Sequence, residues 1–363
     1  MLKGLYIHIP FCSHKCPYCD FVSFVDQSVD HWEYLDLLLK EIELYKDNDF
    51  DLRTIYFGGG TPSLIDPRLY QGFMERLSNL LDLSNVEEIS LEANPENYTL
   101  EEYRYLSSIG FNRISLGAQS LREEGLKALG RIHSVKDTLK ALENIHRAGF
   151  ENINLDLIFG YEGQSLEDLK KELDMLKGLP ITHLSFYLLT PYEDTQFGNL
   201  YSKGLLKLPS EDTIGDMYDL ICDSLEAMGF LHYEISNFAL PGYECKHNLL
   251  YWTHEEFLGL GVSAWSFVNH TRFGNTKNIK LYAQKVKSEK RPVEYQEFLK
   301  GKDLLYDYIF VALRTKRGVE KDLLSIPEEL LEFFEEEDGR WRLNRKGMLV
   351  INEILLRLKI NLC

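Results

Sequence analysis

The stretch Tyr6-Ile-His-Ile-Pro-Phe-Cys12-Ser-His-Lys-Cys16-Pro-Tyr-Cys19-Asp-Phe21 organises the rest of the chain. A run of alternating apolar residues leads into a loop whose three cysteines have the spacing C-x3-C-x2-C. Thiolates are the usual ligands of iron–sulfur clusters, and three of them are one fewer than a closed tetrahedral site requires. A 4Fe-4S cluster on Cys12, Cys16 and Cys19 would therefore leave one iron free for an outside ligand.

A zinc site is the competing interpretation of these cysteines, with His8 or His14 as the fourth ligand. Zinc ligands usually come as two pairs, and no second pair follows in the chain. The number and softness of the ligands favour the cluster. The remaining cysteines, Cys222, Cys245 and Cys363, form no disulfide framework, which is typical of a reducing cytoplasm.

Length and charge limit the possible architectures and partners. A chain of 363 residues suggests two domains, or one barrel with an appendage. The formal net charge of -17 argues against a basic groove for nucleic acid and against docking on anionic lipid. Because no apolar run approaches the ~20 residues of a membrane span, and the first strand begins too early for a signal peptide, we expect a cytoplasmic protein that is not integral to a membrane.

Predicted strands and helices alternate through the first part of the chain. The strands are expected at 4–9, 54–57, 88–92, 113–117, 153–160 and 183–187. This alternation implies right-handed βαβ units and a parallel sheet. The sequence therefore predicts an α/β fold, an incomplete (β/α)6 TIM-like barrel over residues 1–210.

The later part of the chain divides into two further segments. Residues 211–285 are expected to extend the barrel. Charge rises and glycine thins out near residue 285, so residues 286–363 are predicted to form a small, mostly helical domain. A turn followed by a short strand at 340–343 and a last helix at 347–358 gives this domain a winged-helix-like pattern.

Polar residues follow successive predicted strands. In barrels of this kind the carboxyl ends of the strands meet at one face, and functional residues gather there. The cysteines follow the first strand and the glycines of Gly58-Gly-Gly-Thr-Pro62 the second, while Glu92, Gln119 and Asp156 stand at the ends of the next three. Their shared placement predicts one site rather than separate turn glycines and helix caps.

Two further features each allow two interpretations. Arg131 could pair with a carboxylate as a fork, or it could be an exposed arginine at a helix end. His247, with Tyr251 and Trp252 one helical turn further on, could bind haem, because histidine is a common axial ligand and aromatic rings offer flat surfaces. It could equally be a buried, hydrogen-bonded histidine that closes the open end of the barrel, and the residues alone favour this structural role.

The cysteine spacing resembles the radical S-adenosylmethionine (SAM) superfamily, in which the open iron binds SAM and an electron from the cluster cleaves its sulfonium to a 5′-deoxyadenosyl radical. Further motifs make nearly the whole chain similar to the HemW-type haem chaperones, which are relatives of oxygen-independent coproporphyrinogen III dehydrogenase. These motifs are Gly58-Gly-Gly-Thr-Pro62, Gly117-Ala-Gln119-Ser, Asp156-Leu-Ile-Phe-Gly160 and His247-Asn248-x-x-Tyr251-Trp252.

The resemblance implies a set of cofactors and the residues that hold them. It places a 4Fe-4S cluster on Cys12, Cys16 and Cys19, and haem on His247. Tyr18 matches a position that contacts a second SAM in the dehydrogenase. The positions that match SAM-binding residues of the family are Tyr6, Gly59, Gly60, Thr61, Glu92, Gln119, Arg131 and Asp156.

The implied function is a haem chaperone that delivers haem to apo-haemoproteins. Membrane-associated respiratory enzymes are its candidate acceptors, and a homodimer is its candidate assembly. The alternative is the dehydrogenase itself, which converts propionate side chains of coproporphyrinogen III to vinyl groups. Phe21 stands where the dehydrogenase has a further cysteine, and no N-terminal extension precedes the first strand; both features favour the chaperone.

The chain departs from the family pattern at two places. It reads Gly160-Tyr-Glu-Gly163-Gln164 where the family usually has Gly-Leu-Pro-Gly-Gln. It also reads Ser263-Ala-Trp265 where the family usually has Gly-Ala-His. The second departure removes one polar contact near the expected haem site.

Overall fold

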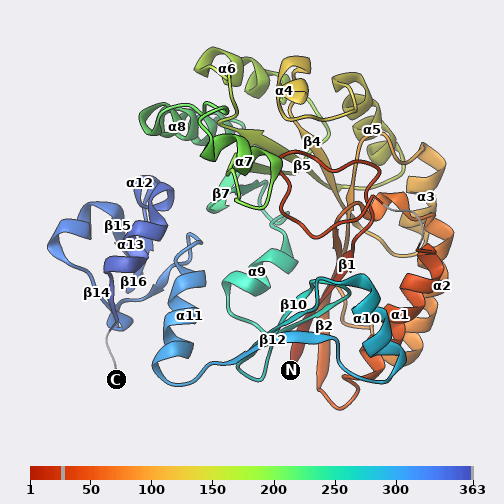
Figure 1. The fold of residues 1–363 in the computed structure, drawn as a ribbon. Helices are drawn as coiled ribbons and strands as arrows, with labels where there is room; N and C mark the ends of the chain where they lie inside the picture. The colour runs from red at the N-terminus through yellow and green to blue at the C-terminus, as the bar shows by residue number, and fades with distance from the viewer. Residues whose placement is uncertain (26–28, 361–363) are drawn as a thin grey trace.

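A twelve-stranded sheet runs through the molecule, which is described here by a computed structural model of residues 1–25 and 29–360 (Figure 1). Its strand order is β12-β11-β10-β9-β1-β2-β3-β4-β5-β6-β8-β7. The six central strands pair in parallel, which confirms the predicted incomplete barrel. They are β1 (Leu2–Ile9), β2 (Phe50–Gly59), β3 (Glu88–Ala93), β4 (Arg113–Gln119), β5 (Asn152–Phe159) and β6 (His183–Leu188).

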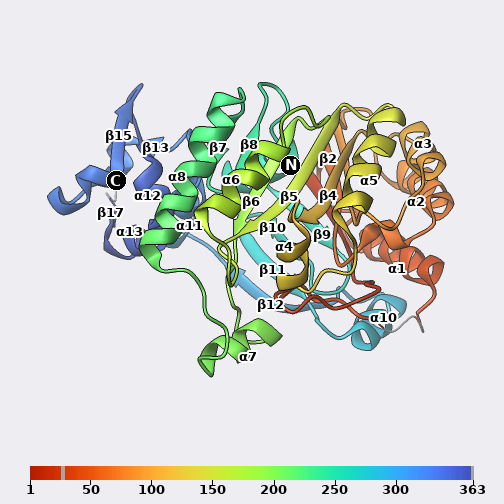
Figure 2. The same cartoon turned by 90° about the horizontal axis from the view of Figure 1, so that it is seen from above.

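Helices between these strands cover the convex face of the sheet (Figures 1 and 2). Three of them begin at capping boxes, with Thr99, Ser134 and Ser165 as the N-caps. The helices are α1 (His31–Glu43), α2 (Pro67–Leu80), α3 (Leu100–Ser108), α4 (Glu123–Ala128), α5 (Val135–Arg147) and α6 (Leu166–Met175), with a short 3-10 turn η1 (Pro62–Leu64) before α2.

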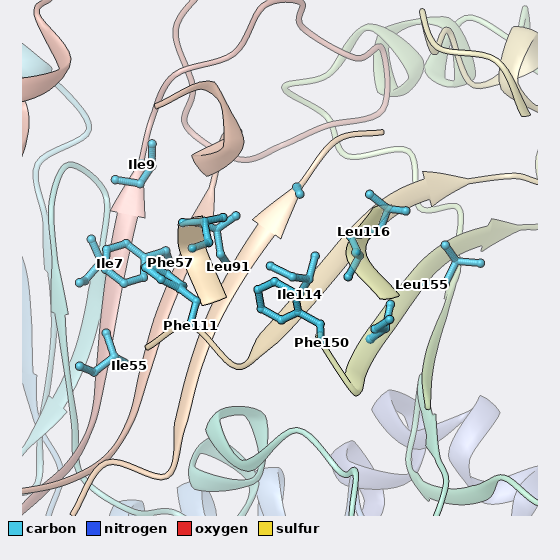
Figure 3. Packing of buried hydrophobic residues seen from close by; sticks show 14 of the residues in the cluster. Ile7, Ile9, Ile55, Phe57, Leu91, Phe111, Ile114, Leu116, Phe150 and Leu155 are labelled. Atoms are coloured by element: carbon cyan, nitrogen blue, oxygen red, sulfur yellow. The ribbon is translucent and has the colours of Figure 1, made fainter. Parts of the chain in front are cut away.

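The apolar core lies between this helical layer and the sheet. Successive strand residues point to opposite faces, so Ile55 and Phe57 face the helices, and Phe111 and Phe150 pack beside them (Figure 3). All four are nearly inaccessible to solvent. Each such side chain stabilises the fold by about 1.5–3 kcal/mol. The same alternation leaves the polar residues of the strands facing the inside of the barrel.

Both edges of the barrel sheet are extended. β9 (Phe257–Leu260) pairs in parallel with β1, and β10 (Trp265–Val268), β11 (Thr271–Asn275) and β12 (Val293–Phe298) follow it antiparallel. On the other edge, β8 (Asn237–Ala239) and β7 (Leu231–Glu234) follow β6. The connecting helices are α7 (Gln196–Ser202), α8 (Glu211–Ala227), α9 (Lys246–Trp252) and α10 (Ile279–Lys287).

A small C-terminal domain lies to one side of the barrel and has a hydrophobic core of its own (Figures 1 and 2). Because β12 still belongs to the large sheet, the boundary falls later than the predicted residue 286. The predicted last helix is two helices that meet at Val350. The domain contains α11 (Lys302–Ala312), β13 (Val319–Glu320), η2 (Lys321–Leu323), β14 (Leu324–Ser325), η3 (Glu328–Phe333), β15 (Phe334–Glu337), β16 (Arg340–Leu343), α12 (Arg345–Leu349), α13 (Ile351–Arg357) and β17 (Lys359–Ile360).

No helix in residues 1–25 and 29–360 is long and apolar enough to cross a membrane.

Several polar contacts tie the added parts to the barrel. Arg345 of the C-terminal domain pairs with Asp223 and Glu226 on α8. Glu41 on α1, a buried carboxylate, joins the β9–β12 extension to the helical layer.

Glu41 should therefore matter for stability. Its oxygens accept hydrogen bonds from the Gly261 N–H (2.8 Å), Asn275 Nδ2 (2.6 Å) and the Tyr282 hydroxyl (2.6 Å). A Glu41→Gln change would turn an amide NH2 toward one of these donors and leave it unpaired. We expect a loss of about 1–3 kcal/mol in the free energy of unfolding, measured by urea titration.

The matched control is Glu43→Gln, an exposed residue at the end of the same helix. Its effect should stay within about 0.5 kcal/mol. Equal losses in the two variants would show that the buried carboxylate does not carry this contact.

Candidate functional site

A cavity of about 430 Å³ opens at the carboxyl ends of the parallel strands. It brings together all of the predicted site residues except Tyr6 and His247. Strand register explains the grouping: Glu92 lies beside Ser115, and Gly117 lies beside Asp156, all on the concave face. The predicted residues that line it are Cys12, Cys16, Tyr18, Cys19, Gly59, Gly60, Thr61, Glu92, Gln119, Arg131 and Asp156.

The three cysteines lie in the loop that follows β1. The Cys12 N–H donates to Phe24 O (3.0 Å), and the Cys19 N–H donates to Cys16 O (3.2 Å), so backbone bonds shape the loop from within. All three thiols are free and partly buried. They provide the three soft ligands that an iron–sulfur cluster requires.

The zinc interpretation gains no support from this geometry. His8, one of the two histidines considered as a fourth ligand, is 4% exposed. Its Nδ1 is 3.1 Å from the Tyr6 hydroxyl and its Nε2 is 2.8 Å from Val22 O, so both ring nitrogens already have partners.

The glycine turn after β2 is held tightly against the cysteine loop. The Gly60 N–H donates to Ile9 O and the Thr61 N–H donates to Phe11 O, each at 2.7 Å. Gly59 has φ +110°, and a Cβ there would lie 2.5 Å from the His8 ring. Only glycine permits this backbone path and this close approach, which leaves backbone groups at the cavity wall.

Glu92 and Asp156 are the two carboxylates of the cavity wall. Glu92 accepts from the Tyr56 hydroxyl (2.9 Å) and the Gly59 N–H (3.0 Å). Burial, followed by the nearby charge of Asp156, raises the pKa of Glu92 to about 7. Asp156 accepts from Ser115 and Asn154, and burial raises its pKa as well. Such carboxylates can bind hydroxyl groups or a cation.

Arg131 is not an exposed helix-end arginine. It reaches from the segment after α4 to the cysteine loop, where Nη1 donates to Cys16 Sγ (3.2 Å). Its Nη2 donates to Asn94 Oδ1 (2.8 Å) and to Gly117 O (3.2 Å). The guanidinium therefore joins three elements of the site and sits where a carboxylate bound near the cysteines could meet it.

Gln119 and Tyr18 occupy special positions in the wall. Gln119 ends β4 with φ +66°, at a break in the register with β5. Non-glycine residues in this region are strained, and such strain is concentrated at functional sites. Tyr18 turns toward Phe197 of α7, with ring centroids 6.4 Å apart. It therefore packs under a neighbouring helix as well as lining the cavity.

Sequence reasoning missed several polar residues of the cavity, among them Arg113 on β4. This arginine is 2% exposed and lines the cavity, and its Nε and Nη1 have no hydrogen-bond partner in the described residues. The positive charge of Arg113 lowers the pKa of both Glu92 and Asp156, and so counteracts part of the increase that burial causes. The alternation of inward and outward side chains along β4 could have predicted that Arg113 faces the inside of the barrel. A charged residue at the start of a strand, however, is usually expected to be exposed to solvent.

His247 lies on α9, next to Asn248, which lines the cavity, and its side chain is fully buried. Its Nδ1 is 2.6 Å from Thr54 Oγ1 and its Nε2 is 2.7 Å from the Tyr251 hydroxyl. Burial lowers its pKa to about 3. Both ring nitrogens are thus engaged, as in the structural interpretation. Ligation of haem by His247 stays a prediction and requires one of these two contacts to break.

Tyr6 stands between the two regions. Its ring stacks beside Tyr56, with centroids 6.2 Å apart, and lies 6.4 Å from the His247 ring. Its hydroxyl meets His8, which holds the cysteine loop. Tyr6 therefore supports the cavity from behind in this structure rather than lining it.

Comparisons with known proteins agree with this geometry. Residues 6–176 match the model of the radical SAM superfamily. A protein of Lactococcus lactis named haem chaperone HemW is 40% identical over 319 residues, which cover 87% of this chain and 83% of that protein. The chain belongs to the HemW family. HemW of Bacillus subtilis is 36% identical, and HemW of Escherichia coli is 32% identical over 97% of both chains.

Solved structures extend the comparison to the fold. The coproporphyrinogen III oxidase HemN of Escherichia coli superposes with a TM-score of 0.83 and covers 98% of this chain and 89% of its own. Its sequence identity is 22%, so this likeness shows a shared fold for the HemW family member. Membership of the radical SAM superfamily implies a 4Fe-4S cluster and SAM, and the three free thiols beside a polar cavity suit both.

The cysteine assignment can be tested by metal analysis. Changing Cys12, Cys16 or Cys19 to serine should each abolish the cluster, because no fourth thiol lies in the loop. Anaerobically reconstituted wild-type protein should contain about four iron and four sulfide per chain. Cys222→Ser, a buried cysteine remote from the loop, is the control and should keep the full content. Full iron and sulfide in any of the three loop variants would contradict the assignment.

The pKa of Glu92 predicts a pH dependence of SAM binding. With a pKa of about 7 this carboxyl is mostly protonated at pH 6 and mostly ionised at pH 8. The ionised form accepts hydrogen bonds and attracts a cation, so SAM affinity should rise about tenfold between these two values. Isothermal titration calorimetry measures this change.

Glu92→Gln should remove most of that pH dependence, because an amide does not titrate. Glu143→Gln, an exposed residue of α5, should leave it unchanged. Equal SAM affinity of the wild type at pH 6 and pH 8 would exclude Glu92 as a titrating contact.

Proposed function

We propose that this chain is a haem-binding radical SAM protein that acts as a haem chaperone and delivers haem to apo-haemoproteins. Its similarity to proteins named haem chaperone HemW is the observation that carries the proposal: it reaches 40% identity and extends over most of both chains. The assembled cavity adds support, because it has room for a ligand between the cysteines and the two carboxylates.

Within this proposal the cluster is held by Cys12, Cys16 and Cys19. Arg131 would pair with the SAM carboxylate, since its guanidinium already reaches the cysteine loop. The cluster, when bound, supplies one electron to SAM. The residues proposed to bind SAM are Tyr18, Gly59, Gly60, Thr61, Glu92, Gln119, Arg131 and Asp156, which line the cavity. Tyr6, which also matches a SAM-binding position of the family, lies behind this wall with its hydroxyl on His8.

The proposed setting is the cytoplasm, and the proposed acceptors include membrane-associated respiratory enzymes. Five cysteines lie in the described residues, and all are free thiols, which suits a reducing compartment. The net charge of -17 argues against nucleic acid as a partner, because the phosphate backbone is also negatively charged. A homodimer remains part of the proposal. Porphyrin biosynthesis would be its setting only under the alternative function, the dehydrogenase.

A haem titration tests the proposal directly. Haem added to the anaerobically reconstituted protein should give a saturating change of the Soret band, as expected for one defined site. The bound haem should then pass to an apo-haemoprotein, with loss of the chaperone spectrum and gain of the acceptor spectrum. Absorbance that rises in proportion to added haem, without saturation, would count against a haem carrier.

The alternative function is separated by product analysis. The same protein incubated anaerobically with coproporphyrinogen III, SAM and a reductant should form no decarboxylated porphyrinogen beyond a trace. Repeated turnover to protoporphyrinogen would establish the dehydrogenase in place of the chaperone.

A further inference from the structure

The mouth of the cavity differs in character from its interior. Three large side chains that line it are exposed, Phe21 (56%), Leu188 (42%) and Tyr192 (50%), while Tyr187 (42%) exposes part of its ring and has its hydroxyl near Ser185 and the interior carboxylates. The deeper wall carries the carboxylates and hydroxyls described above. Exposed apolar side chains gathered around a concavity mark a binding surface rather than a random part of the exterior. The cavity therefore offers a polar inner half and an apolar outer half.

These apolar residues come from two different parts of the fold. Phe21 belongs to the cysteine loop, where Lys15 Nζ donates to its carbonyl oxygen. Tyr187 and Leu188 end β6, and Tyr192 follows in the segment that leads to α7. The Phe197 N–H of α7 donates to Pro17 O (2.9 Å), which keeps this segment beside the cysteine loop (Figure 1). The cysteine loop and the segment between β6 and α7 thus form two walls of one opening.

The chemistry of the mouth matches a tetrapyrrole. A tetrapyrrole is a large flat apolar ring with carboxylates at its edge, and aromatic side chains provide suitable contact surfaces. Lys15 lines the same cavity and supplies a positive charge for a propionate. The polar wall suits the ribose and charged groups of a smaller ligand such as SAM, whereas the exposed apolar side chains suit a larger flat ring.

Ligation of haem iron by histidine requires an accessible ring nitrogen, so the positions of the histidines show where such a ligand is available. His247 is fully buried, and both of its ring nitrogens have partners. His14 is the histidine among the described residues that line the cavity, and it is exposed. It lies between Cys12 and Cys16, on the same loop as Phe21. Histidine is a common axial ligand of haem iron.

We propose that the mouth of the cavity is the haem seat, with Phe21 and Tyr192 against the macrocycle and His14 as the axial ligand. This inference rests on the proposed chaperone function and adds the position of its ligand. Haem would then lie over the loop that holds the cluster.

Spectroscopic haem titrations of the reconstituted holoprotein test the proposal. His14→Ala should shift the Soret band, remove the signature of histidine ligation and weaken haem binding about tenfold or more. Added imidazole should restore the spectrum, because it replaces the missing ligand. Phe21→Ser combined with Tyr192→Ser should weaken binding by a similar factor and leave the histidine-ligated spectrum in place.

Matched controls separate ligation from damage to the loop. His146→Ala, an exposed residue of α5, should keep the wild-type Soret position. Iron and sulfide content, measured on every variant, shows whether the cluster loop is intact. A His14→Ala variant that keeps its cluster and the wild-type haem spectrum would overturn the proposal.

Other outcomes are equally informative. If His247→Ala alone loses the histidine-ligated spectrum, the haem seat lies at α9 and the inference is wrong while the chaperone function stands. If the wild type shows no saturable haem binding, the proposed function fails, and the haem seat with it.

Discussion

The need to pair polar groups inside the barrel governs the rest of this structure. Parallel strands that expose their apolar side chains to the covering helices turn every second residue inward, and many of these are charged or hydroxylic. Each buried carboxylate therefore requires donors nearby. Glu92 finds them in Tyr56 and Gly59, and Asp156 finds them in Ser115 and Asn154. The residues that form these stabilising hydrogen bonds also form the walls of the site.

The same requirement closes the lower end of the barrel. Glu88 on β3 accepts from the backbone N–H groups of Lys246 and His247, each at 3.0 Å, and so caps the start of α9. This carboxylate fixes the helix on which the His-Asn-x-x-Tyr-Trp motif stands. The motif therefore has a structural reason to be where it is, independent of any ligand. Similar motifs support the assignment to the family, but they do not by themselves show where haem binds.

Much of the fold and of the polar wall of the cavity followed from local patterns in the sequence. The cysteine spacing, the glycine turn and the polar residues at strand ends could be read because parallel strands bring those ends together. The two features that the sequence left open, the roles of Arg131 and His247, depend on long-range packing. Whether Arg131 reaches inward depends on the path of the chain after α4, and whether His247 is accessible depends on contacts with Thr54 from a distant strand. The apolar mouth is also a tertiary property, since Phe21 and Tyr192 meet only in the folded molecule.

The cap on α9 also bears on the order in which the molecule folds. Glu88 and the helix it caps are separated by about 160 positions, as the spacings of 158 and 159 residues to Lys246 and His247 show. Contacts of such long range form late, because closing a long loop costs entropy before the contact repays it. The first strands and helices pair with near neighbours in the sequence, so we expect them to assemble before α9 docks. The His-Asn-x-x-Tyr-Trp segment should then be among the last parts to settle, with the barrel interior accessible from that end until it does.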